Sequence, residues 1–333
     1  VRGCAPPILK RESSHSMHVI SASRRTDISA FYSSWFMNRI RDGVVGVRSP
    51  FGRRMFEVPL RPKDVIAIVF WTKNAAPLLP YLDELRDRGY PFTFLYTVNN
   101  YPSALEPRVP PLAHTLATLE TLRRKVPNLL IRWRYDTIVF ADELTAKWHV
   151  KNFSFLCKQL APYTDQCIFS FCDYYRKTIR NMEQRLPHYF VPDEQQSREL
   201  AGSLAEIAEA HGMILASCAH HSLVSGSIQH ARCIDPEWLK GAVDSLPRRE
   251  ALLALKTTPT RPGCLCAASR DIGAYDTCPH GCVYCYANAN PEQALRNAAA
   301  IPDDAYCLEP FCSARARAGE EFREPPTRGV VKS

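Results

Sequence analysis

The sequence lacks any long apolar segment. Its longest apolar run is Val65–Trp71, far shorter than the roughly 20 apolar residues that a membrane-spanning helix requires. The stretch before the first methionine, VRGCAPPILKRESSHS, contains Arg2 and Lys10 but no continuous apolar core, so we expect no secretory signal there. These absences predict a cytoplasmic protein without a membrane span.

The chain also lacks a block of like charge. Its 42 lysine and arginine residues against 34 aspartate and glutamate residues give a net charge of +8, spread along the length. This balance permits an anionic substrate without requiring one. The arginines are neither massed on one helix nor interleaved with exposed aromatic residues, as in a nucleic-acid-binding stripe. Nucleic acid is therefore only weakly supported as a partner.

The length of 333 residues exceeds that of a usual single core, so we expect either two domains or one large α/β barrel. A hydrophobic content of 46% and a charged content of 23% are ordinary for a globular protein. Because the first methionine is Met17, we expect residues 1–16 to be a disordered extension. We assign residues 17–300 to one domain and expect 301–333 to be a partly flexible tail.

Short β-branched or aromatic runs alternate with longer helical patterns along the chain. We predict strands at 18–23, 65–72, 92–98, 130–135, 167–171 and 213–218, and helices at 33–42, 77–88, 112–125, 143–160 and 194–211. Strict strand–helix alternation predicts a parallel sheet with right-handed crossovers. The fold class is therefore α/β, as a full or partial (β/α) barrel. An open doubly wound sheet is the alternative.

Polar residues follow each predicted strand. In either architecture the site forms at the carboxyl ends of the strands. The residues that we expect to border a pocket there include Ser21, Ser23, Arg24, Arg25, Asp27, Thr72, Lys73, Arg132, Arg134 and Asp136, with Asn99 and Asp173 at the ends of two further strands. Some of these residues will instead be ordinary loop or cap residues, because strand-to-helix loops are polar anyway. Arg132 and Arg134 share one face of a strand, where a buried arginine requires an acid or a ligand.

Thirteen cysteines distinguish this composition. In the cytoplasm we do not expect them to form a disulfide framework, so clustered ones indicate metal or redox chemistry. Cys278, Cys282 and Cys285 have a C-x3-C-x2-C spacing. Structural zinc is one interpretation, but it usually has four ligands, and His280 lies between two of them on a tight loop. Three thiolates suit a cubane cluster better, because they leave one iron open.

At these residues the sequence resembles radical S-adenosylmethionine (radical SAM) enzymes, in which an aromatic residue, here Tyr284, directly precedes the last cysteine of such a loop. The resemblance implies that Cys278, Cys282 and Cys285 bind a [4Fe–4S] cluster, that SAM binds its open iron, and that Tyr284 lies near the adenine. It also implies that an electron from a donor such as ferredoxin or flavodoxin cleaves SAM. The resulting 5′-deoxyadenosyl radical would abstract hydrogen from the substrate.

The resemblance suggests roles for the strand-end residues. Hydroxyl and carboxylate groups are candidates to hold the ribose and ammonium groups of SAM, namely Ser21, Ser23, Thr72 and Asp136. Cationic groups could meet its carboxylate or an anionic substrate, namely Arg24, Arg25, Lys73, Arg132 and Arg134. As catalytic candidates we name Arg132, Arg134, Asp136, Lys73 and Asp27.

The cysteine loop comes late, whereas radical SAM enzymes usually have it after the first barrel strand. A circular permutation would explain this position, with 269–275 as the strand before the loop and a helix after it, capped by Asn290 with Pro291 in its first turn. From Met17 to about Pro310 the chain also resembles a bacterial family of unknown function. The motifs are ISASRRTDI, FWTKN, WRYD, CIDP and DIGAYDTCPHGCVYCYAN.

A second cysteine group comprises Cys218, Cys233, Cys264 and Cys266. Four thiolates suffice for an auxiliary [4Fe–4S] cluster. The alternative is that these are buried core or loop thiols, because free cysteine is among the most buried residue types. We expect packing roles for Cys157, Cys167 and Cys172, and we place Cys307 and Cys312 in the flexible tail.

We therefore predict a radical SAM-like enzyme with one [4Fe–4S] cluster and a possible second one, whose substrate is unknown. The alternative from another class is a non-enzymatic iron–sulfur or zinc protein that binds nucleic acid through its basic strand-end residues.

Overall fold

The computed structural model describes residues 17–49, 54–186, 188–310 and 312. Its main sheet contains eight parallel strands in the order β10-β1-β4-β5-β6-β7-β8-β9. They are β1 (His18–Ala22), β4 (Val65–Thr72), β5 (Phe92–Thr97), β6 (Ile131–Ile138), β7 (Gln166–Phe171), β8 (Ile214–Ser217), β9 (Gln229–His230) and β10 (Arg270–Asp271). A separate antiparallel hairpin pairs β2 (Val44–Arg48) with β3 (Met55–Pro59).

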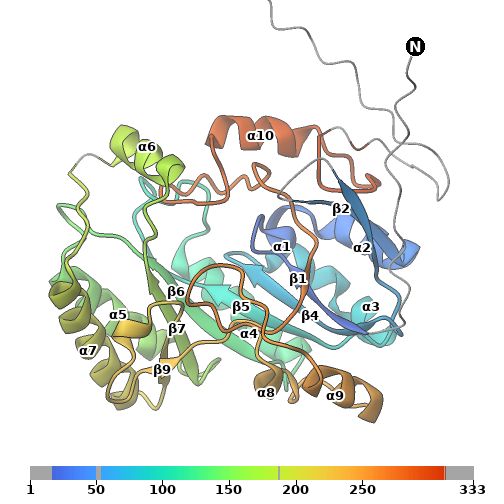
Figure 1. Ribbon diagram of the computed structural model, residues 1–333, viewed down its shortest axis with the longest axis horizontal. Helices are drawn as coiled ribbons and strands as arrows, with labels where there is room; N and C mark the ends of the chain where they lie inside the picture. Colours follow the sequence, from blue (N-terminus) through green and yellow to red (C-terminus); the bar gives the residue numbers. More distant parts are fainter. Residues whose placement is uncertain (1–16, 50–53, 187, 311, 313–333) are drawn as a thin grey trace, which may run out of the picture.

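Helices connect the strands, as parallel pairing requires. The longer ones are α2 (Ser33–Asp42), α4 (Leu112–Lys125), α5 (Ala146–Leu160), α6 (Arg176–Arg185), α7 (Glu194–Ala210), α9 (Leu246–Leu253) and α10 (Pro291–Ala299). The shorter ones are α1 (Ile28–Phe31), η1 (Ala76–Tyr81), α3 (Leu82–Asp87), η2 (His221–Leu223) and α8 (Pro236–Leu239). Helices α5 and α7 pack against each other (Figure 1). Among the helices of the described residues, none combines the length and apolarity of a membrane span.

Strand β4 illustrates how the sheet is buried on both faces. All of its residues, Val65–Thr72, are buried. Ile68 and Phe70 belong to the large core that includes the helices after the strands, whereas Val69 and Trp71 belong to a second core. Because side chains alternate between the faces of a strand, β4 lies between these two cores.

The second core is closed by the segment between β9 and β10. Leu239 of α8 and Leu252 of α9 are buried in it together with inward-facing strand residues. The segment ends in β10, which pairs with β1 through Ile20 opposite Arg270. In Figure 1 the orange C-terminal part of the chain therefore lies beside the blue first strand. The strand that comes last in the sequence, β10, is thus the neighbour of the strand that comes first, β1.

The predicted parallel α/β sheet is confirmed. Predicted strands 18–23, 65–72 and 92–98 match β1, β4 and β5 to within one residue at each end, and α2 and α4 have the predicted bounds. The predicted helix 77–88 instead divides into η1 and α3, since Pro80 lies inside it and cannot donate a backbone hydrogen bond. The β2–β3 hairpin, α6, α8 and α9 were not predicted.

The C-terminal elements follow the prediction in part. Helix α10 begins as expected, with the Asn290 side chain accepting a hydrogen bond from Gln293 N and Pro291 in its first turn. The predicted strand 269–275 is shorter, because only Arg270–Asp271 pair with β1.

The first part of the predicted flexible tail packs on the β2–β3 hairpin and α2. Trp35 Nε1 donates to Ala305 O at 2.8 Å, and Gly46 N donates to Tyr306 O at 2.9 Å. Cys307 and Cys312 are buried here and form a disulfide, although no disulfide was expected. Residues 1–16 and 313–333, for which we predicted disorder and partial flexibility, lie outside the described residues.

Candidate functional site

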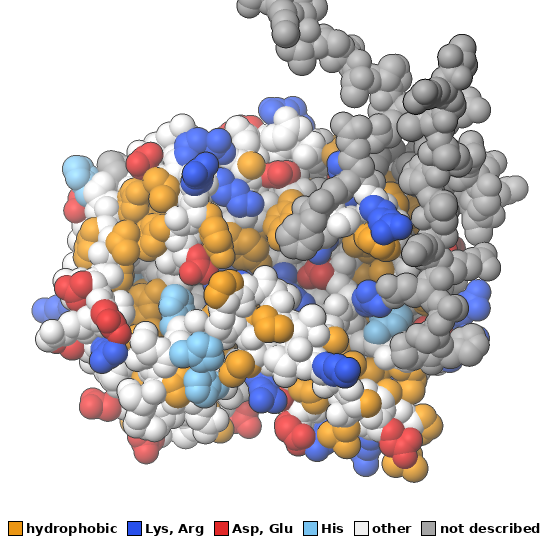
Figure 2. All heavy atoms as spheres, viewed as in Figure 1, with side chains coloured by type: hydrophobic (Ala, Val, Ile, Leu, Met, Phe, Trp, Pro, Cys, Tyr) orange, Lys and Arg blue, Asp and Glu red, His pale blue; other side chains and the backbone are white. Residues whose placement is uncertain are grey.

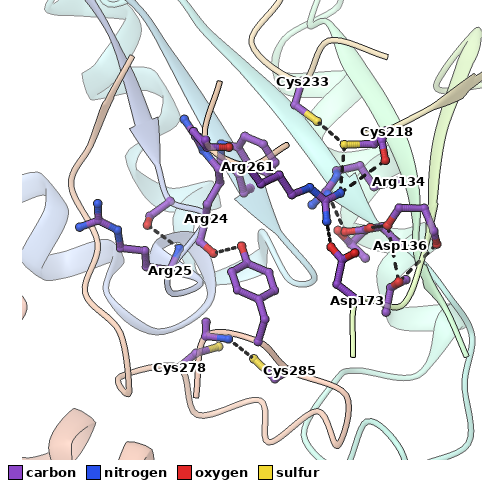
Figure 3. A pocket seen from close by; sticks show the side chains of 18 of the residues that line it. Arg24, Arg25, Arg134, Asp136, Asp173, Cys218, Cys233, Arg261, Cys278 and Cys285 are labelled. Carbon is purple, nitrogen blue, oxygen red and sulfur yellow. Dashed lines mark hydrogen bonds and ion pairs between the residues drawn. The ribbon is translucent and has the colours of Figure 1, made fainter. Parts of the chain in front are cut away.

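One cavity of about 740 Å³ lies at the carboxyl ends of the strands, within the size range of small-molecule sites. Residues at the ends of β1, β4, β6, β7 and β8 line it, together with the segment after β10. In Figure 3, Cys278 and Cys285 lie below this space and Cys218 and Cys233 above it, with Arg261 and Asp173 between them. The predicted position of the site at the strand ends agrees with this cavity.

The three cysteines of the 278–285 loop, Cys278, Cys282 and Cys285, all line the cavity. Backbone N–H groups point at the sulfur of Cys285, including that of Ala287 at 3.3 Å, and Asn288 Nδ2 holds Cys278 O at 2.7 Å. Burial raises the pKa of Cys278 to about 12 and also raises the pKa values of the other two thiols. Without a cation these thiols are therefore neutral at pH 7.

Asp27 connects this loop to the first two strands of the site. One carboxylate oxygen accepts hydrogen bonds from Ala30 N and Thr72 Oγ1, at 3.0 and 2.8 Å. The other oxygen accepts from Lys73 N at 2.7 Å and lies 2.8 Å from His280 Nε2. Because Asp27 and His280 are almost fully buried, this contact fixes the loop over the ends of β1 and β4. Asp27 and Thr72, predicted site residues, thus serve as supports for the loop.

The side chain of Tyr284, a residue of the loop, lies in a buried polar network. Its hydroxyl donates to Glu106 Oε1 and accepts from Asn99 Nδ2, and Lys73 Nζ lies 3.2 Å from the same hydroxyl. Lys73 Nζ also forms an ion pair with Glu106 at 2.8 Å. Burial opposes both charges, but the ion pair outweighs it, so the pKa of Lys73 is raised and that of Glu106 is lowered. Lys73 and Tyr284, both predicted site residues, line the cavity and contact each other.

Two guanidinium groups lie over the ring of Trp71 on the cavity wall. The guanidinium carbon of Arg24 is 5.3 Å from the centroid of its ring, and that of Arg134 is 4.8 Å away. The indole N–H of Trp71 and the Nε atoms of both arginines are buried and find no hydrogen-bond partner among the described residues. An unsatisfied buried donor costs about 1–3 kcal/mol. These three donors would be satisfied by a ligand that carries acceptor atoms.

Arg134 and Asp136 form an ion pair at 2.5 Å on the wall of the cavity, and Ser170 donates a hydrogen bond to the same carboxylate. Burial alone would raise the pKa of Asp136, but the charge of Arg134 and the Ser170 hydrogen bond hold it below its usual value. A second pair, Arg261 with Asp173, lies beside it in Figure 3. The wall of the cavity therefore carries positively charged arginine and negatively charged aspartate side chains at neutral pH.

Asp271 of β10 organises the end of β1. It accepts hydrogen bonds from Ser21 Oγ, Ser23 Oγ and Arg24 N, at 2.8, 2.6 and 2.9 Å. Ser23, Arg24 and Arg25 line the cavity, whereas Ser21 is not among its lining residues. Arg25 extends to Gly273 O at 3.3 Å. The two serines predicted to bind SAM are therefore engaged by Asp271.

Arg132 differs from Arg134 although both project from the same face of β6. Arg132 forms an ion pair with Asp235 at 2.9 Å and stacks on Trp238 at 4.5 Å, and it is not among the residues that line the cavity. Helix α8 covers this lower part of the face, whereas Arg134 lies nearer the strand end. The prediction that Arg132 meets an acid agrees with this contact, but the structure places it outside the predicted pocket.

The second cysteine group, Cys218, Cys233, Cys264 and Cys266, comes together on the far side of the same cavity, and all four residues are buried. Cys157 and Cys167 are core residues, as predicted. Cys172 is buried in a third apolar cluster and also reaches the cavity.

Several residues of the site could not be identified from the sequence. Glu106 lies in a proline-rich loop, and Asp271 lies in a two-residue strand, so neither had a periodic signal. Arg261 and Asp173 are 88 residues apart, and only the fold shows that they pair. The position of Asp173 shortly after a predicted strand is the one signal that the sequence offers for this pair.

Within the described part of the chain, no three His, Cys, Asp or Glu side chains converge closely enough to hold a single metal ion. A cubane cluster is bound through separate iron atoms, so its thiolates surround a body several atoms wide.

The fold and site together define a parallel α/β protein with a cysteine-lined cavity at the carboxyl ends of its strands. The family model described as Domain of unknown function (DUF1848) matches residues 19–287, most of the chain. The protein therefore belongs to the DUF1848 family, which agrees with the resemblance to a family of unknown function. The matched span includes all seven cysteines of the two cavity groups. None of the curated proteins and none of the solved structures compared matches the chain.

Proposed function

We propose that this protein is a radical SAM-like enzyme. In this proposal Cys278, Cys282 and Cys285 bind a [4Fe–4S] cluster, SAM binds at its open iron, and the substrate carries an anionic group. The observation that carries the proposal is the shared cavity. The three cysteines of the loop face a space of about 740 Å³ that is lined by charged groups from the ends of several strands. Such a space is large enough for a cofactor and part of a substrate.

The surroundings of the loop support a cluster. Backbone N–H groups donate toward Cys285, and hydrogen bonds of this kind tune the charge of cluster sulfurs. The high pKa of the buried Cys278 thiol means that binding must displace protons, which an iron–sulfur cluster can do. When bound, the cluster and SAM together would supply the radical that abstracts hydrogen from a substrate.

The cavity wall supports SAM as the cofactor. The unsatisfied donors of Trp71, Arg24 and Arg134 would receive its carboxylate or the anionic group of a substrate. Asp136, whose pKa is lowered, remains ionised and would attract the cationic part of SAM. Lys73 and Glu106 hold the side chain of Tyr284, next to Cys285 in the loop. Ferredoxin or flavodoxin would supply the electron.

The strand order supports a permuted, partial barrel. The element that leads into the cysteine loop, β10, lies next to β1 and at the edge of the sheet. In sequence it comes last, whereas in space it takes the place before β1. A radical SAM-like barrel whose first unit had moved to the end of the chain would have this neighbour relation.

The test is anaerobic reconstitution with iron and sulfide, followed by SAM and a chemical reductant. We expect a brown protein that forms 5′-deoxyadenosine. Replacing Cys278, Cys282 and Cys285 together by alanine should remove about four irons per chain, the content of one cubane, and abolish 5′-deoxyadenosine formation. The control is Cys157→Ala/Cys167→Ala, which removes two buried thiols outside the cavity and should preserve both readouts.

One zinc per chain with no sulfide would contradict the proposal. A stable cluster without SAM cleavage, combined with salt-dependent binding of nucleic acid, would favour the non-enzymatic alternative. On the face drawn in Figure 2, lysine and arginine side chains are interspersed with acidic and apolar ones, which gives that alternative little support.

A further inference from the structure

We infer that Cys218, Cys233, Cys264 and Cys266 bind a second iron–sulfur centre, an auxiliary [4Fe–4S] cluster with four thiolate ligands. This inference concerns a separate group of residues, and it does not depend on the activity proposed for the 278–285 loop. It follows from the contacts among the thiols, the backbone contact that brings their segments together and the groups that surround the sulfurs.

The four thiols form one continuous group. Cys218 Sγ lies 4.0 Å from Cys233 Sγ, and the Cys266 thiol is within hydrogen-bonding reach of both Cys233 and Cys264. All four residues are between 2% and 8% exposed. They come from three segments between β8 and β10. Proximity along the sequence explains only the pair Cys264 and Cys266, and not its approach to Cys218 and Cys233.

A close backbone contact brings two of the cysteine segments together. Cys218 follows β8, and Cys264 precedes β10. Gly263 has a φ of +74°, and a Cβ at this position would lie 2.3 Å from Ala219 O. Only glycine permits this approach. The contact places Cys264 beside the end of β8.

Polar and cationic groups surround the sulfurs. Ile234 N donates to Cys266 Sγ at 3.5 Å, Arg261 Nη2 donates to Cys218 Sγ at 3.5 Å, and Thr260 Oγ1 lies 3.6 Å from Cys264 Sγ. Such donors stabilise thiolates and cluster sulfurs. The charge of Arg134 also acts on the nearer thiols, and it would offset the negative charge of a four-thiolate cluster.

Packing alone is a weaker explanation of this group. Cys157 of α5 is a packing cysteine that belongs to the large apolar core. Burial is the one cause that raises the pKa of its thiol. The four thiols of the second group instead border the open cavity, which leaves room for the body of a cluster. The opposite wall of that cavity carries Cys278 and Cys285 (Figure 3), so the two centres would face each other across the space for a substrate.

The test measures iron, sulfide and zinc in anaerobically reconstituted full-length protein. We expect about eight irons per chain in the unmodified protein and about four in Cys233→Ala/Cys266→Ala. The matched control, Cys157→Ala/Cys167→Ala, removes another neighbouring pair of buried thiols and should keep about eight. The triple alanine variant of the 278–285 loop should keep about four irons, with the electron paramagnetic resonance spectrum of the auxiliary cluster alone.

The loop variant also decides the question if Cys233→Ala/Cys266→Ala fails to fold, because it leaves all four ligands in place. A folded loop variant with no bound iron, or with one zinc in place of the cluster, would overturn the inference. A total of only about four irons in the unmodified protein, kept in full by the loop variant and lost completely in Cys233→Ala/Cys266→Ala, would uphold the auxiliary cluster and count against the proposed function.

Discussion

At the scale of single residues, two arginines of one strand show how position determines role. Arg132 and Arg134 lie on the same face of β6, each forms an ion pair, and each stacks on a tryptophan. Only Arg134 borders the cavity, and its Nε atom has no hydrogen-bond partner among the residues described. The guanidinium group of Arg132 forms an ion pair with Asp235, the N-cap residue of α8. The two residues therefore form a matched pair for mutation.

We predict that Arg134→Met weakens SAM binding to the reconstituted protein by about 2–5 kcal/mol, the usual cost of removing a charged partner from a closed site. Arg132→Met should lower thermal stability, because it leaves Asp235 unpaired, while SAM affinity stays within about twofold (about 0.4 kcal/mol) of the unmodified protein. Equilibrium binding and thermal unfolding measure the two effects. Equal losses of SAM affinity in both variants would show that Arg134 has no special role.

At the scale of elements, the contact between β10 and β1 positions the cysteine loop. Asp271 of β10 accepts hydrogen bonds from two serines of β1 and its end, Ser21 and Ser23. The next residues approach so closely that a Cβ on Gly273 would lie 2.1 Å from Ser23 Oγ. The loop is therefore held to the sheet by a contact that tolerates no added atom.

Gly273→Ala should lower the free energy of unfolding by about 1–3 kcal/mol, as expected for overpacking, and should lower the iron content of the reconstituted protein. The control is Gly202→Ala on α7, where a Cβ would meet nothing within 4 Å. That change should stabilise the protein by about 0.5–1 kcal/mol, because alanine favours a helix. Urea titrations of both variants give the comparison. A neutral Gly273→Ala would mean that the loop can shift without loss.

At the scale of the whole molecule, the larger of the two cores that cover the sheet encloses a histidine side chain. His149 of α5 is fully buried, and it contacts Tyr135 Oη through Nδ1 at 2.8 Å and Val139 O through Nε2 at 2.9 Å. Because Val139 O can only accept, Nε2 carries the proton and Nδ1 accepts from the tyrosine. Burial lowers the pKa of His149 to about 4.

The folded pKa of His149 lies below that of an unfolded chain, so the unfolded state binds a proton first as the pH falls. Its contribution to stability is complete above about pH 6.5 and is lost as the pH falls toward 4, by up to about 3 kcal/mol. We predict that His149→Gln flattens the dependence of unfolding free energy on pH between 6.5 and 4. His114→Gln on the exposed side of α4 should keep it. An unchanged slope in the His149 variant would contradict the buried neutral imidazole.

Much of the fold was predictable from local pattern. The apolar run Val65–Thr72 predicted a strand, and the bounds of α2 and α4 followed from helical periodicity. The cysteine spacing at 278–285 likewise depends on residues close in sequence. Short elements such as β9 and β10 carried too few residues to show a period. Their pairing arises from backbone contacts with strands far away in sequence.

The sequence by itself determined the alternation of strands and helices, the position of polar residues at the strand ends and the two groups of cysteines, because periodicity and spacing are local properties. Only the tertiary structure decided that β10 lies beside β1, that Arg134 borders the cavity while Arg132 does not, and that Glu106 and Asp271 support the site. Asp271 meets Ser21 across 250 residues. Such contacts depend on the path of the whole chain through space, and no local pattern records that path.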